Sequence, residues 1–182
     1  MIWFGLPLWT FCFGSPIRPW RARLNMNAKY ALFGLFHRTL DQRYFRWKRG
    51  LTFGARVAVI DGEGRFLLVK QSYAPGWLFP GGGVEFGETC EEAALRELHE
   101  EAEVKPTGPL VLHGVFSNHA KFRDDHLVVY VLREFEWSGF APTREIVAAE
   151  FFAVDALPPD VTASTKRRID ELTGKVVISL HW

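Results

Sequence analysis

This chain of 182 residues has little cysteine and no overall excess of charge of one sign. Its two cysteines, Cys12 and Cys90, lie far apart and form no Cys-x-x-Cys pattern, which argues against a disulfide framework or a zinc site. The sequence therefore favours a reducing compartment, the cytoplasm. With 22 basic and 21 acidic residues, the chain gives no overall case for a stable nucleic-acid partner. Its 48% hydrophobic content excludes a disordered or fibrous chain.

Acidic residues are scarce in the first part of the chain. Up to Phe53 there are nine lysines and arginines but one acid, Asp41, whereas the remainder holds 13 basic and 20 acidic residues. The same first part contains 13 of the 27 aromatic residues. This asymmetry predicts a basic, aromatic extension over residues 1–50 and an acidic domain over residues 51–182.

Residues 1–14 carry no charge, but this run is shorter than the roughly 20 residues that a membrane-spanning helix needs. Pro7 interrupts it, and the arginines follow it instead of preceding it as in a signal peptide. Three interpretations stay open. The run is an anchor at a membrane surface, a segment packed on the domain, or an artefact of a start site assigned too early, with Met26 as the true first residue.

Residues 28–48 have the pattern of an amphipathic helix. Their large apolar side chains fall on one stripe at helical spacing: Phe33, Phe36, Leu40, Tyr44 and Trp47. We favour packing of this stripe on the domain. The alternative is weak association of residues 1–48 with a membrane surface, which would place a cytoplasmic protein at the periphery of the membrane.

From residue 55 onward, strand patterns outnumber helix patterns. Strands are predicted in ARVAVI, RFLLVKQ, PLVLHGVF, HLVVYVLREF and FFAV. One helix is predicted to begin after Thr89, with Glu92 completing a capping box, and to run to about Ala102; another is predicted over residues 162–172. No regular strand–helix–strand repeat appears, so the expected class is α+β with a mixed sheet.

The first of these helices carries Glu97, Glu100 and Glu101 on one face. Three carboxylates within one turn repel one another, and a hard divalent cation such as Mg²⁺ would offset that repulsion. The alternative is a solvated helix joined by pairs such as Glu92–Arg96. The preceding glycines at positions 81–83 favour the metal site, because they let the backbone approach a ligand closely.

The spacing of these residues forms a longer pattern. Gly82 is followed by five residues and Glu88, then by seven residues and the run Arg96-Glu97-Leu98-His99-Glu100-Glu101. This resembles the Nudix box, G-x5-E-x7-R-E-U-x-E-E-x-G-U, where U is a bulky apolar residue. The one departure is Glu103, where the family has glycine. We expect this departure to affect stability through a strained helix end, with activity retained.

The resemblance covers about residues 52–160 and implies a Nudix-type alpha/beta/alpha sandwich with a mixed sheet. It implies hydrolysis of a nucleoside diphosphate linked to another group, with Mg²⁺ as cofactor and Mn²⁺ as the alternative ion. The metal ligands that it implies are Glu97, Glu100, Glu101 and the carbonyl of Gly81 or Gly82. Arg96 would orient the glutamates. The general base would be a glutamate of the box, Glu100 or Glu101, or the later Glu145.

Substrate contacts are expected from Lys70 on phosphate, Trp77 on a base, and the backbone at Gly82 and Gly83. The expected partner is a small nucleotide. The alternative function is a Nudix-like module that binds a nucleotide without cleaving it. The complete set of glutamates argues against this alternative, because a module that only binds has no need of them.

Overall fold

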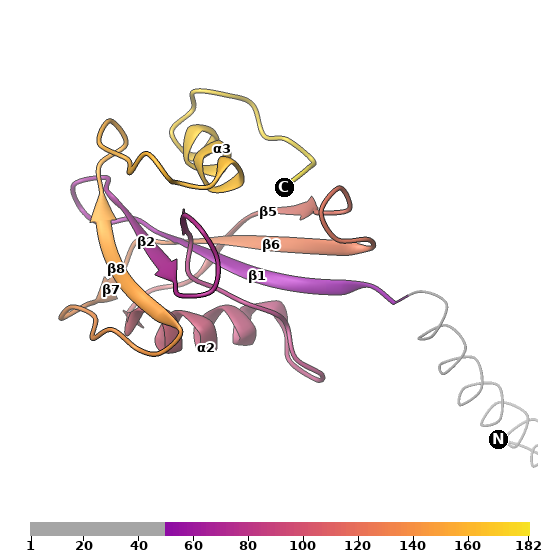
Figure 1. Cartoon of the computed structure of the whole chain (residues 1–182), viewed down its shortest axis with the longest axis horizontal. Helices are drawn as coiled ribbons and strands as arrows, with labels where there is room; N and C mark the ends of the chain where they lie inside the picture. Colours follow the sequence, from indigo (N-terminus) through magenta and orange to yellow (C-terminus); the bar gives the residue numbers. More distant parts are fainter. Residues whose placement is uncertain (1–49) are drawn as a thin grey trace, which may run out of the picture. The chain divides into compact units, whose positions relative to one another are not determined.

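The computed structural model describes residues 50–182 (Figure 1). The uncharged run at residues 1–14 and the helix predicted at residues 28–48 lie outside the described residues, and the division of the chain at residue 50 stays a prediction. None of the helices within residues 50–182 combines the length and the apolar composition that crossing a membrane requires.

The first of two three-stranded sheets combines parallel and antiparallel pairing. Strand β1 (Thr52–Val59) runs parallel to β6 (Asp125–Leu132), and β6 pairs antiparallel with β5 (Val111–Ser117). Because β1 and β6 are far apart in sequence, their parallel pairing joins the two ends of a long crossover that includes the glutamate-rich helix. The sheet is therefore mixed, as the sequence predicted.

The second sheet is antiparallel. Strand β2 (Phe66–Gln71) lies between β3 (Trp77–Leu78) and β8 (Ile146–Phe152). A short ladder pairs β4 (Lys105–Pro106) with β7 (Phe135–Glu136). The two β7 residues lie at or just past the end of the HLVVYVLREF segment, which the sequence had predicted as one strand, so that prediction was wrong for its last residues.

Two helices begin after threonine caps. Helix α2 (Cys90–Ala102) starts at Thr89, whose side chain accepts the N–H of Glu92 while the Glu92 carboxylate accepts the N–H of Thr89. This is the predicted capping box. Helix α3 (Ala163–Leu172) starts after Thr162. Both helices therefore begin where local sequence signals place them.

The helices cover opposite sides of the strands (Figure 1). Because side chains alternate along a strand, neighbouring residues of β1 enter different cores. Val57 packs in the core that contains Leu98 of α2, whereas Ala58 packs in the core that contains Ile169 of α3. The predicted alpha/beta/alpha sandwich is confirmed by these two cores.

Helix α2 ends at a residue in the left-handed conformation. Glu103 has φ 53° and ψ 28°, and its N–H donates to the carbonyl of His99 over 3.1 Å. Only glycine adopts this conformation without steric cost, and Glu103 is the residue at which the sequence departs from the Nudix box.

We expect Glu103→Gly to raise the free energy of unfolding by about 1 kcal/mol, because it removes the clash between Cβ and the backbone at positive φ. Urea unfolding measures this change. The matched control is Glu103→Ala, which loses the carboxylate but keeps Cβ and should give no gain. Equal stability of the glycine and alanine variants would show that the left-handed conformation carries no strain.

Candidate functional site

A glycine-rich loop lies directly against β1. The N–H groups of Val57 and Ala55 donate to the carbonyls of Pro80 and Gly82 over 3.0 and 2.9 Å. Between these two bonds, Gly81 has φ 140°, and a Cβ placed there would collide with the carbonyl of Ala55. Glycine is therefore required at position 81 by both its backbone conformation and its neighbours.

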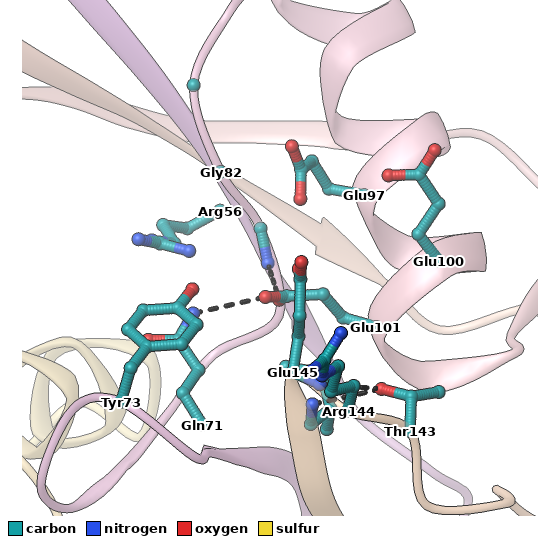
Figure 2. Close-up of a pocket in the computed structure, with 13 residues that line it drawn as sticks. Arg56, Gln71, Tyr73, Gly82, Glu97, Glu100, Glu101, Thr143, Arg144 and Glu145 are labelled. Atoms are coloured by element: carbon teal, nitrogen blue, oxygen red, sulfur yellow. Dashed lines mark hydrogen bonds between the residues drawn. The ribbon is translucent and has the colours of Figure 1, made fainter.

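This loop forms one wall of a pocket of about 580 Å³ (Figure 2). Helix α2 forms a second wall, and the chain just before and at the start of β8 forms a third. The pocket is lined by Arg56, Gln71, Tyr73, Gly81, Gly82, Gly83, Glu97, Glu100, Glu101, Thr143, Arg144, Glu145 and Ile146. Residues from five separate parts of the chain thus meet at one site.

Glu101 is the most enclosed carboxylate of the pocket, with 8% of its surface exposed. One of its oxygens accepts the N–H of Gly81 over 2.7 Å, and the other accepts the amide of Gln71 over 3.1 Å. Burial raises the pKa of Glu101, and the two hydrogen bonds oppose that rise only in part. Its carboxylate is therefore held in place at the base of the pocket.

Arg96 holds the outer carboxylates. Its Nε and Nη2 donate to the two oxygens of Glu88 over 2.8 and 3.1 Å, and its Nη1 donates to Glu97 over 2.7 Å. A weaker contact of 3.4 Å reaches Glu100. Its Nη2 also donates to the carbonyl of Gly83, which ties the glycine loop to α2. The two hydrogen bonds from Arg96 to Glu88 lower the pKa of Glu88 to about 2.

The donor chemistry of the pocket suits a hard divalent cation. Glu97, Glu100 and Glu101 present oxygen donors from one helix, which is the ligand type that Mg²⁺ prefers. Among residues 50–182, no three His, Cys, Asp or Glu side chains are already arranged as a metal site, so the carboxylates must turn to bind one. Gly82 leaves room for this, because any Cβ there would overlap the carboxylate of Glu97.

The two carbonyls considered as ligands differ in their hydrogen bonding. The Gly82 carbonyl accepts the N–H of Ala55, whereas no described residue donates a hydrogen bond to the Gly81 carbonyl. Gly81 is therefore the better carbonyl donor for a cation.

Lys70 and Trp77, expected from the sequence to contact substrate, do not line this pocket. Lys70 forms a 2.9 Å ion pair with Asp160 and lies over the ring of Trp77. Trp77 is buried against Phe152 in the core beneath α3. Lys70 shares its strand face with Leu68, which also enters that core, so alternation along β2 directs both side chains away from α2.

Several lining residues were not expected from the sequence: Arg56, Gln71, Tyr73, Thr143 and Arg144. Arg56 lies in the middle of β1 and Gln71 at the end of β2, whereas Tyr73, Thr143 and Arg144 lie in loops. All five are outside any motif. A usable signal existed for Arg56 alone, because it is a single charged residue within the apolar run ARVAVI.

Comparison with known proteins identifies a matching family and several similar proteins. Residues 50–172 match the family described as "NUDIX domain". The structure of a MutT NUDIX hydrolase from Burkholderia pseudomallei is 28% identical and superimposes with a TM-score of 0.59, covering 66% of this chain and 97% of that one. An ADP-ribose pyrophosphatase of Methanocaldococcus jannaschii is 32% identical over 105 residues, which are 55% of this chain and 61% of that protein.

A further match is shorter. An RNA pyrophosphohydrolase of Hydrogenovibrio crunogenus is 38% identical over 56 residues, which are 31% of this chain and 34% of that protein. The chain thus spans between about a third and three fifths of the length of these two curated relatives.

The Glu88–Arg96 pair predicts a specific dependence of stability on pH. Because the pKa of Glu88 falls from 4.5 to about 2 on folding, its contribution is complete above pH 4.5 and is lost as the pH falls toward 2. We expect Glu88→Gln to flatten the decline in the free energy of unfolding across this window, measured by urea unfolding at several pH values. The control Glu91→Gln, an exposed change on the helix that carries Arg96, should keep the wild-type slope. An unchanged slope in Glu88→Gln would contradict the ion pair.

Proposed function

The chain belongs to the NUDIX family, and on this premise we propose that it hydrolyses the phosphoric anhydride bond of a nucleoside diphosphate linked to another group. The observation that carries the proposal is the pocket itself. It brings Glu97, Glu100 and Glu101 together with Glu145 and the glycine loop. Hydrolysis requires a bound diphosphate, a cation and a water molecule. The acidic side chains can bind the cation, and the glycine loop lets the backbone come close to the diphosphate.

We assign the binding of a divalent cation, Mg²⁺ or Mn²⁺, to Glu97, Glu100, Glu101 and the carbonyl of Gly81. Such an ion neutralises phosphate charge and makes a bound water more acidic. The chain itself supplies the positioning. Arg96 holds Glu97 against the glycine loop, and the N–H of Gly81 holds Glu101. These hydrogen bonds keep both carboxylates beside the loop, so each has less freedom to lose than an unrestrained glutamate when it turns to bind an ion.

We assign the general base to Glu145. Both oxygens of Glu101 already accept hydrogen bonds, which suits a ligand that must stay in place. The Glu145 carboxylate lines the same pocket, is exposed, and accepts no hydrogen bond from the residues that the structure describes. It is therefore free to take a proton from a water molecule that attacks phosphorus.

The proposed substrate class follows from the type of bond that the relatives are named for cleaving. One relative is named for RNA and another for ADP-ribose, and both names describe cleavage of a pyrophosphate bond. A small nucleotide containing this bond is therefore the proposed substrate. The experiment is release of nucleoside monophosphate or phosphate in the presence of Mg²⁺, across a panel of nucleoside diphosphate derivatives. Nucleotide binding without turnover would favour the non-catalytic module.

We expect Glu101→Gln and Glu100→Gln each to lower turnover by about 10²-fold or more, because a neutral amide holds a cation poorly. The matched control is Glu91→Gln, which changes an exposed glutamate on the first turn of the same helix and should keep wild-type turnover. Near-normal rates in both site variants would rule out the carboxylate assignment.

For Glu145→Gln we expect turnover to fall by about 10²-fold while the affinity for Mg²⁺ stays close to that of the wild type. The reason is that the amide cannot accept the proton, yet the glutamates of α2 are unchanged. Steady-state rates and calorimetric titration with Mg²⁺ measure the two quantities. If the rate is unaffected, the base is one of the glutamates on α2.

A further inference from the structure

Arg56 is a charged residue in the middle of the apolar strand β1, opposite Val129 of β6. Its guanidinium donates no hydrogen bond to any residue within 50–182, and its Nη1 is also closed off from solvent. Arginine carries five N–H donors in a fixed planar arrangement. A donor set of this size without protein partners is uncommon in a folded core and requires an explanation.

The surroundings of Arg56 indicate what kind of ligand its guanidinium could bind. Its side chain lines the same pocket as the glutamates, and Figure 2 draws it beside Tyr73, across the view from Glu97 and Glu100. Burial lowers the pKa of Arg56, while the charges of Glu101 and Glu97 oppose this effect. These two carboxylates favour the guanidinium electrostatically, although neither forms a hydrogen bond with it.

Charge neutralisation then points to an anion. Four glutamates and two arginines line the pocket, so the empty lining is acidic and would repel a diphosphate. Once a cation occupies Glu97 and Glu101, those carboxylates no longer balance Arg56. A group with several negative oxygens is then needed on the arginine side of the pocket, and the planar guanidinium matches phosphate oxygens in bidentate geometry.

We propose that Arg56 is a substrate-binding residue that donates hydrogen bonds to the non-bridging oxygens of one phosphate of the diphosphate. This inference rests on the proposed function, since it assumes a diphosphate in the same pocket. It adds a contact from β1, on the sheet, to the contacts from α2. The diphosphate would then be held from both sides, by the cation on the glutamates and by Arg56.

The test measures binding without hydrolysis. The full chain is titrated calorimetrically with Mg²⁺ alone, and then with methylenediphosphonate in the presence of Mg²⁺. This probe resembles a diphosphate, has no cleavable bridge, and carries no base or sugar. We expect Arg56→Gln to weaken binding of the diphosphonate by about 10- to 100-fold, while Mg²⁺ binds at least as tightly as in the wild type.

The matched control is Arg133→Gln, an exposed arginine outside this pocket, which should leave both affinities unchanged. If Arg56→Gln does not fold, Arg56→Lys decides the question. It keeps the positive charge beside the glutamates but loses the planar fork, and it should bind the diphosphonate several-fold more weakly than the wild type.

Three outcomes would overturn the proposal. In the first, the Arg56 variant that folds binds the diphosphonate with an affinity within twofold of the wild type. In the second, the variant loses Mg²⁺ affinity and diphosphonate affinity equally, which would mean that Arg56 acts only through the glutamates. In the third, the wild type does not bind the diphosphonate. Failure of the proposed function is a separate result, because it is seen as absent turnover in the wild type whatever the diphosphonate affinities are.

Discussion

The glycine loop lies so close to both β1 and α2 that no other residue type fits at its centre. At Gly81 a Cβ would strike the carbonyl of Ala55, and the N–H of the same residue holds the carboxylate of Glu101. At Gly82 a Cβ would overlap Glu97. These two glycines fix how far α2 stands from the sheet, and they set the position of its glutamates. The pocket geometry therefore depends on the lack of a Cβ at these two glycines as much as on the carboxylates.

Placing several carboxylates on one helix face would destabilise the helix if each had to be balanced by solvent alone. In this structure the balance is divided among different partners. Arg96 pairs with Glu97 and Glu88, the backbone at Gly81 serves Glu101, and Glu100 stays exposed with a single long contact to Arg96. A cation entering the pocket must compete with Arg96 for Glu97. Folding stability and the proposed cation binding thus depend on the same side chains, which is common at functional sites.

What could be predicted from the sequence was local. The capping box, the extent of α2 and the glutamate face depend on residues within a few positions of one another, and the family resemblance added Glu145. The walls of the pocket that β2 and β8 form depend instead on pairing between strands that are distant in the sequence. Lys70 and Gln71 are adjacent in β2, yet alternation sends Lys70 toward α3 and lets Gln71 reach Glu101. Opposite them, β8 carries one extra residue, Val147, and this bulge could not be read from the sequence.

The lining of the pocket also bears on which part of a substrate it can recognise. Among the described residues that line it, Tyr73 is the one aromatic side chain and Ile146 the one aliphatic chain, and Tyr73 is largely exposed. A base bound there would gain limited stacking and little apolar burial. Charged groups and backbone dipoles dominate instead, and these interact with phosphates. The composition of the pocket therefore suits the diphosphate of the proposed substrate better than its base.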